Sequence, residues 1–270
     1  MTAFGADAVV LLTGGASGIG AACALLAGER GAAVAVADID RDGAEAVAGE
    51  IRRRGGKAAA FAMDVRSEAD VEATVAEVET VLGPVTGCVA SAGILQTPLP
   101  PEELPISVYD DVIAVDQRGV YVTCVAVGRR MAVRGAGSIV TIASIAGMRS
   151  MPLHPYSQAK AAVISMSESL AAEWGRSGVR VNAVCPGYTL TPALAAAIDS
   201  GKRDPTLLQD NAALGRLVTP EEIAEGVLFL LSDAARAITG ISLPVDAGWL
   251  VAPSWHTYGG LRPRRGNADA

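Results

Sequence analysis

The chain has 270 residues, of which 50% are apolar and 19% are charged. A chain of this size can bury one substantial core, and a single α/β domain can use all of it. The formal net charge of −7 argues against a nucleic-acid partner, because a phosphate backbone is bound through clustered Lys and Arg side chains. No apolar run approaches the roughly 18 residues of a membrane span, so we expect no membrane partner.

Cysteine and histidine usage narrows the possible chemistry. The four cysteines are far apart, in segments that we expect to be buried, and their spacing fits neither a zinc site nor a redox motif. We expect free structural thiols and a cytoplasmic protein, since disulfides persist in oxidising compartments. With only two histidines, His154 and His256, we expect no histidine-based metal site. The cysteines are Cys23, Cys88, Cys124 and Cys185.

The first motif lies near the N-terminus. An apolar run over 8–12 precedes a glycine-rich stretch over 13–20, and a helix-like segment follows over 21–30. Glycines at 14, 18 and 20 let the backbone approach a pyrophosphate, and a helix N-terminus offers free N–H groups. A plain glycine-rich turn is the alternative interpretation. The flanking strand and helix favour phosphate binding.

The helix-like segment over 21–30 separates Gly20 from a second apolar run over 32–37. This run is followed by Asp38. A carboxylate there can accept hydrogen bonds from both ribose hydroxyls of an adenosine, and it would repel a 2′-phosphate. No Lys or Arg lies in the glycine loop or immediately after Asp38 to bind such a phosphate. The alternative is that Asp38 caps the next helix, a role that Asp40 could also fill.

Strand-like runs alternate with helical stretches along the whole chain, which is typical of parallel βαβ units. We therefore predict a doubly wound, parallel, seven-stranded sheet with helices on both faces and a ligand crevice at the carboxyl ends of the strands. The predicted strands span 8–13, 32–38, 57–63, 87–90, 137–142, 180–185 and 241–245.

A tyrosine and a lysine, Tyr156 and Lys160, lie four residues apart in a helical stretch, so their side chains share one face. A free phenol, with a pKa of about 10, is a poor proton-transfer group at neutral pH, and a neighbouring ammonium favours its phenolate form. The pair is therefore a candidate acid–base device. Taken alone, the same spacing also fits a solvated helix surface.

Together these motifs resemble the classical short-chain dehydrogenase/reductase family, and the resemblance runs almost end to end. Further segments match the family after the third, fourth, fifth, sixth and last predicted strands. They are Asp64-Val65, Ser91-Ala92-Gly93, Ser144 within 142–147, Pro186-Gly187-Tyr188-Thr189-Leu190-Thr191, and Val245-Asp246-Ala247-Gly248.

The resemblance implies a Rossmann-type single domain over 1–260, with a substrate lid at about 189–215 and a polar tail over 261–270. It implies an oxidoreductase that transfers a hydride between nicotinamide and an uncharged secondary alcohol or ketone, and Asp38 favours NAD. The alternatives are an NADPH-type 3-oxoacyl or polyketide ketoreductase and a nonenzymatic dinucleotide-binding protein. A homotetramer is also implied, paired through helices around 105–133 and 156–174.

Site residues follow from the matched positions. The catalytic group would comprise Ser144, Tyr156, Lys160 and Asp116. The cofactor-binding group would comprise Gly14, Ser17, Gly18, Ile19, Gly20, Asp38, Ile39, Asp64, Val65, Ser91, Ala92, Gly93, Tyr156, Lys160, Pro186, Gly187, Thr189 and Thr191.

The chain departs from the family pattern at two asparagines. Asp116 replaces an asparagine that positions a water beside the lysine, and its charge favours the lysine ammonium, so we expect an altered pH profile. Ser91 replaces the asparagine of an Asn-Ala-Gly motif, and we expect a modest loss of stability. The interval from Ser144 to Tyr156 is also one residue shorter than is usual in the family.

Substrate selectivity is the least determined feature. We expect a mostly apolar pocket formed by the lid and by the segment between Ser144 and Tyr156, although each contributor could equally be core packing. The aromatic residues Trp249, Trp255 and Tyr258 would form a pocket wall or a subunit contact. The remaining expected contributors are Ile94, Ile145, Met151, Leu153, His154, Tyr188, Leu190, Leu194 and Leu208.

Overall fold

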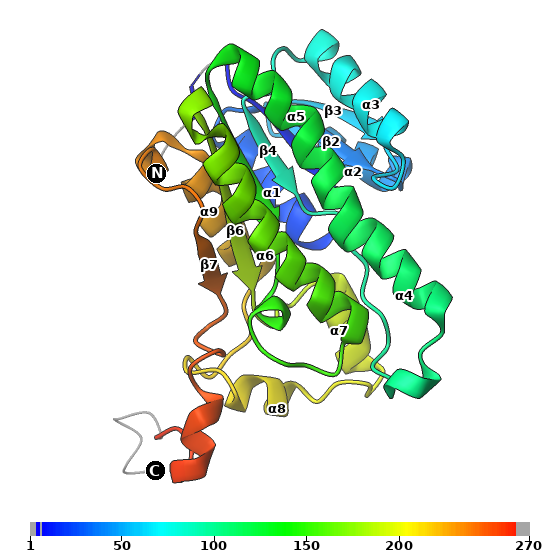
Figure 1. The fold of residues 1–270 in the computed structure, drawn as a ribbon, viewed down its shortest axis with the longest axis vertical. Helices are drawn as coiled ribbons and strands as arrows, with labels where there is room; N and C mark the ends of the chain where they lie inside the picture. Colours follow the sequence, from blue (N-terminus) through cyan, green and yellow to red (C-terminus); the bar gives the residue numbers. More distant parts are fainter. Residues whose placement is uncertain (1–3, 6, 263–270) are drawn as a thin grey trace.

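The computed structural model describes residues 4, 5 and 7–262 (Figure 1). Residues 1–3, 6 and 263–270 lie outside the described part of the chain, and with them most of the predicted polar tail over 261–270. None of the helices in the described part is long and apolar enough to cross a membrane.

A seven-stranded parallel sheet forms the centre of the molecule, with strand order β3-β2-β1-β4-β5-β6-β7. This confirms the predicted fold class, and each strand end lies within about one residue of its predicted position. The strands are β1 (Val9–Thr13), β2 (Ala33–Asp38), β3 (Lys57–Ala62), β4 (Gly87–Ala90), β5 (Gly137–Ile142), β6 (Val179–Pro186) and β7 (Ser242–Val245).

Helices cover both faces of the sheet, so its central strands are apolar on both sides. Along β1, Val9 and Leu11 face the core layer under α3, α5 and α6, whereas Val10 and Leu12 face the layer under α1, α2 and α9. Figure 1 shows α5 and α6 running across one face. These helices are α1 (Gly18–Glu29), α2 (Arg41–Arg53), α3 (Glu68–Val81), α5 (Val120–Arg134), α6 (His154–Trp174) and α9 (Pro220–Leu231).

The strand order reverses between β1 and β4, which places a crevice at their carboxyl ends. The segments that follow β1 and β4 lie close together there. Gly14 follows β1 with φ +67°, and a Cβ at this position would lie 2.7 Å from the Cα of Ala92, which follows β4. Only glycine meets both the conformational and the steric requirement at this position.

The long helix predicted over 105–133 is interrupted. It consists of α4 (Ile106–Ile113), a π-helical turn (Ala114–Gly119) and then α5, which ends at Gly135 with φ +77°. Such π turns insert an extra residue into a helix and recur at functional sites. This one carries Asp116, which is fully buried.

The predicted lid contains two short helices, α7 (Pro192–Asp199) and α8 (Pro205–Asp210), at the carboxyl-end edge of the sheet (Figure 1). Its base is closed by a bridge between Thr189 and Val218, in which the Leu190 N–H donates to the Val218 carbonyl at 2.8 Å. The base is therefore fixed to the domain, and α7 lines the crevice.

Candidate active site

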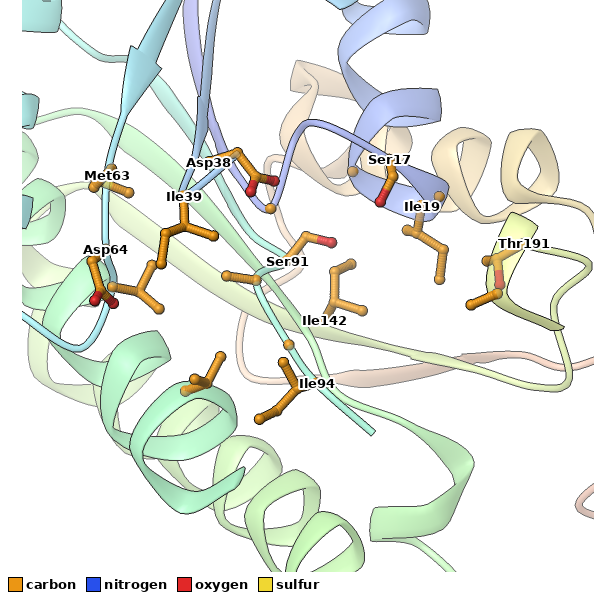
Figure 2. Close-up of a pocket in the computed structure, with 18 of the residues that line it drawn as sticks. Ser17, Ile19, Asp38, Ile39, Met63, Asp64, Ser91, Ile94, Ile142 and Thr191 are labelled. Atoms are coloured by element: carbon orange, nitrogen blue, oxygen red, sulfur yellow. The ribbon is translucent and has the colours of Figure 1, made fainter. Parts of the chain in front are cut away.

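A cavity of about 570 Å³ follows the carboxyl ends of the strands. Figure 2 shows it as an elongated groove with Asp64 near one end and Thr191 near the other. All the predicted cofactor-binding residues line it except Pro186, Gly187 and Thr189, which line an adjoining cavity. Further lining residues that were not among the predicted cofactor-binding residues are Met63, Arg66, Asp111, Val115, Ile142, Pro192 and Ala193, together with Ile94, which was expected in the substrate pocket.

The glycine loop is shaped for close approach of a ligand. A Cβ at Gly20 would lie 2.0 Å from the Gly14 carbonyl oxygen, so this turn cannot accommodate a side chain there. The helix α1 begins at Gly18, and the Ser17 side chain makes no capping hydrogen bond to it. The N-terminal amides of α1 therefore lack a side-chain cap, which fits a pyrophosphate at this position.

Asp38 ends β2 and lines the same cavity. Its two carboxylate oxygens accept backbone hydrogen bonds from Ala16 at 3.0 Å and from Asp40 at 2.9 Å. Helix α2 is capped by Asp40, which accepts from the Gly43 N–H at 3.0 Å. Asp38 is thus held in one orientation without serving as the cap, and each oxygen retains acceptor capacity for a ribose hydroxyl.

Two cations line this cavity among the described residues, and each has an acidic partner. Arg66 forms an ion pair with Asp64 at 2.7 Å, and its hydrogen bonds hold the pKa of Asp64 below the ordinary value. Lys160 pairs with Asp116 at 3.1 Å. Both cations are therefore already neutralised by an aspartate, and neither is free to bind a 2′-phosphate.

Lys160 is almost completely buried behind the cavity wall. Its ammonium donates to the Ile142 carbonyl at 3.0 Å and lies 5.4 Å from the centroid of the Tyr156 ring. Burial lowers the pKa of Lys160, but the charges of Asp116 and Tyr156 outweigh burial, and the pKa is raised. Lys160 is therefore an ammonium at neutral pH.

Asp116 pairs with Lys160 and does not line either cavity. Its second oxygen accepts from the Ile94 N–H at 2.8 Å. Burial raises the pKa of Asp116, and the positive charge of Lys160 opposes that rise. A Cβ at Gly93 would lie 2.8 Å from the carboxylate, so glycine is needed to leave room for it. Among the described residues, Asp116 thus contacts Lys160 and the Ile94 backbone and is not exposed in either cavity.

Ser144 is buried at the end of β5 and lines a second cavity. Its hydroxyl oxygen accepts from the Ala146 N–H at 3.1 Å, which leaves the hydroxyl hydrogen free to donate to a ligand. Tyr156 lines both cavities and so separates the space beside Lys160 from the space beside Ser144.

The second cavity has a volume of about 740 Å³. It confirms Ile145, Met151, Leu153, Tyr188 and Leu194 as lining residues. The expectation was wrong for three others. His154 at the start of α6, Leu190 before α7 and Leu208 on α8 line neither cavity, and Ile94 lines the first cavity instead.

Two groups of lining residues in this cavity were missed. One is the segment after β4, Leu95, Gln96, Thr97 and Pro98, which has no periodic pattern from which its direction could be inferred. The other is Lys202 and Arg203, which lie within the predicted lid range and give the cavity a charge that the expected, mostly apolar pocket lacked.

The aromatic residues near the C-terminus separate into two groups. Trp249 packs edge-on against Tyr188, with ring centroids 5.8 Å apart, and so supports the wall of the second cavity. Trp255 and Tyr258 lie in a 3₁₀ segment (Pro253–Tyr258) and are exposed.

Ser91 lies in the cofactor cavity, where its hydroxyl makes no hydrogen bond to the described residues. Beyond the backbone ladder between β1 and β4, the Thr13 side chain ties the end of β1 to the segment after β4. Its hydroxyl oxygen accepts from the Ser91 N–H at 3.2 Å and from the Ala92 N–H at 3.3 Å.

Comparison with known proteins places this site in a family. A family model described as enoyl-(acyl carrier protein) reductase matches residues 14–250. D-threitol dehydrogenase of Mycolicibacterium smegmatis is 39% identical over 244 residues, which cover 90% of this chain and 93% of that protein.

Two solved structures are similar along nearly the whole chain. One, described as ribose-5-phosphate isomerase from Brucella melitensis 16M, is 50% identical with a TM-score of 0.92 and covers 97% of this chain and 100% of its own. The other, NAD⁺-bound xylitol dehydrogenase, is 29% identical with a TM-score of 0.85, and the match covers 90% of this chain and 98% of that one. The family match and the dehydrogenase relatives agree with the site geometry, and the chain belongs to the short-chain dehydrogenase/reductase family.

Proposed function

We propose that the protein is an NAD-dependent dehydrogenase that interconverts a secondary alcohol and its ketone. The observation that carries this proposal is the position of Tyr156 between two cavities. Buried Lys160 lies on the cofactor side and the Ser144 hydroxyl on the other. A proton-transfer group at this boundary can act on a substrate oxygen while the carbinol carbon faces the cofactor.

Each of the three side chains has a distinct role in the proposal. Ser144 donates its free hydroxyl hydrogen to the substrate oxygen and orients it. Tyr156 accepts the alcohol proton during oxidation and returns it during reduction, and the Lys160 ammonium lies 5.4 Å from the centroid of its ring. The bound nicotinamide supplies the hydride acceptor or donor.

The preference for NAD rests on Asp38. Two backbone hydrogen bonds hold its carboxylate at the edge of the cavity. A 2′-phosphate would bring like charge to this carboxylate, while the cations lining the described cavity are already paired. These contacts support NAD over NADP, and therefore a dehydrogenase over an NADPH-type ketoreductase.

The test is the formation of NADH at 340 nm from a panel of secondary and cyclic alcohols, with NAD and NADP in parallel and with Tyr156→Phe as the control variant. The proposal requires turnover with NAD that the variant loses. NADPH-preferring reduction of thioester ketones would favour the ketoreductase. Binding of NAD without turnover would favour a nonenzymatic role, and interconversion of sugar phosphates without net NADH would favour an isomerase.

We also propose a homotetramer, with α5 and α6 in subunit contacts. Two apolar side chains of α5, Tyr121 and Val133, are exposed in the single chain, which supports such a contact. Light scattering that gave the mass of one subunit, 27.4 kDa, would contradict it.

The four cysteines are buried free thiols, as expected. The cytoplasmic location of the protein stays a prediction.

A further inference from the structure

The second cavity carries an unusual charge for this protein. Among the described residues that line it, Lys202 and Arg203 are the charged side chains, and no carboxylate accompanies them. The chain as a whole has a net charge of −7. A cationic cavity in an acidic protein creates a local field that attracts anions while the remaining surface repels them.

These two cations lie in a defined turn between α7 and α8. The Arg203 N–H donates to the Ala197 carbonyl at 3.1 Å, and Gly201, with φ +73°, donates to the Ile198 carbonyl at 2.9 Å. The turn therefore folds back against the end of α7 and fixes the direction in which its residues leave the helix.

Within the described residues neither cation forms an ion pair. The nearest acids in sequence are Asp199 and Asp204, and one oxygen of Asp204 accepts from the Thr206 N–H at 2.8 Å as the cap of α8. Lys202 and Arg203 thus retain their capacity to bind an added anion.

A second, independent observation comes from Gln96, which lines the same cavity and is only 7% exposed. Its side-chain oxygen is buried without a hydrogen-bond partner in the described structure. A buried amide oxygen without a partner is rare in folded proteins, and because this oxygen accepts, it indicates that a hydrogen-bond donor of the ligand, such as a hydroxyl, belongs in the cavity beside the two cations. An entirely apolar substrate would leave it unsatisfied.

We propose that the substrate is a secondary alcohol or ketone that carries an anionic group remote from the reacting carbon, and that Lys202 and Arg203 bind this group. The inference rests on the proposed dehydrogenase function and refines it. The reacting carbinol beside Ser144 and Tyr156 is uncharged, whereas the far end of the substrate carries a carboxylate, sulfonate or phosphate. The sequence-based expectation of a wholly uncharged substrate is revised accordingly.

The competing explanation is that Lys202 and Arg203 only balance the negative end of the α7 helix dipole. In that case their removal would lower stability without changing ligand selectivity. The two explanations are separated by the variant Lys202→Gln/Arg203→Gln. The matched control is Arg176→Gln, which removes an exposed cation that lines neither cavity.

The first measurement is thermal stabilisation by non-reacting ligands in the presence of NAD. Cyclohexanecarboxylate, cyclohexanesulfonate and cyclohexyl phosphate are compared with the neutral cyclohexanecarboxamide. We expect larger stabilisation by the anions, lost in the double variant and retained in Arg176→Gln. The anion that stabilises most identifies the charged group. Equal stabilisation by the amide and the anions, or an unchanged preference in the double variant, would overturn the inference.

The second measurement is kinetic and uses 4-hydroxycyclohexanecarboxylate and its carboxamide. We expect the double variant to lose about tenfold in kcat/KM for the carboxylate through KM, with kcat and the amide reaction unchanged, since each partly exposed ion pair contributes a factor of a few. Turnover of both compounds without a charge preference would refute the anion site and leave the dehydrogenase intact. Anion-selective stabilisation without NADH from any alcohol would refute the dehydrogenase and leave the anion site intact.

Discussion

Replacement of Asp116 by asparagine should move the whole pH–rate profile of alcohol oxidation to lower pH. Lys160 Nζ lies 3.1 Å from the Asp116 carboxylate and 5.4 Å from the Tyr156 ring centroid. The carboxylate oxygen is therefore at most about 8.5 Å from that centroid. Removing a negative charge lowers the proton affinity of every group nearby, so both limbs of the profile should move in the same direction.

The size of this shift follows from Coulomb's law. The two charges are the Asp116 carboxylate and a phenolate at Tyr156. With an effective dielectric constant of about 20, repulsion between two unit charges about 8.5 Å apart is about 2 kcal/mol, or about 1.4 pH units. Screening by the bound ligands and water reduces this, and we expect the acid limb to move by about 1 unit. The alkaline limb should follow, because the raised pKa of Lys160 depends on the Asp116 charge.

The assay is kcat/KM for NADH formation from pH 5 to pH 11 at constant ionic strength. Asparagine retains a side-chain oxygen that can accept from the Ile94 N–H, so the fold around the site should survive. Glu77→Gln, which removes an exposed carboxylate on α3 outside both cavities, is the matched control. Superimposed curves for Asp116→Asn and the parent, or a shift to higher pH, would refute the reasoning.

Three further variants test the cofactor site and the fold. Asp38→Ala should lower the ratio of kcat/KM for NAD over NADP by about 10- to 100-fold, since charge-assisted hydrogen bonds to the ribose are lost, whereas an unchanged ratio would refute the selector role. Gly20→Ala should abolish NAD binding in calorimetry, because the new Cβ would lie 2.0 Å from the Gly14 carbonyl oxygen, while Gly175→Ala, whose Cβ meets no atom within 4 Å, should be tolerated. Thr219→Ala removes the capping box with Glu222 on α9 and should lower the melting temperature by about 2 to 4 °C, corresponding to about 1 kcal/mol; an unchanged melting temperature would contradict that contribution.

The strands could be predicted closely because each is a short apolar run with a turn signal on either side. Parallel strands covered by helices on both faces are apolar at nearly every position, so these continuous runs stand out from the sequence around them. Motif spacing likewise located the glycine loop, Asp38 and Tyr156 at the carboxyl edge of the sheet. Sequence alone could not assign the cap of α2. The structure does so, because the Gly43 N–H reaches Asp40 while Asp38 is held by Ala16.

Features that depend on local backbone geometry could not be predicted. The π-helical turn over 114–119 continues directly from α4 into α5, and its tertiary contacts, which include Asp116 with Lys160 and Gly119 with Val65, leave no pattern in the sequence. The direction of Lys202 and Arg203 depends on the turn after α7, and a pair of cations in a loop otherwise indicates a solvated surface. The loop residue Gln96 gave no signal, because its burial arises from tertiary contacts alone.

The most direct test of the proposed chemistry is the fate of the hydrogen on the carbinol carbon. A secondary alcohol that turns over is labelled with deuterium at that carbon, and the mass of the NADH formed is measured. The proposal predicts one deuterium in NADH, a slower reaction than with unlabelled alcohol when hydride transfer limits the rate, and no product with Tyr156→Phe. Deuterium that is absent from NADH, and is found instead in water or in a rearranged product, would contradict direct hydride transfer at this site.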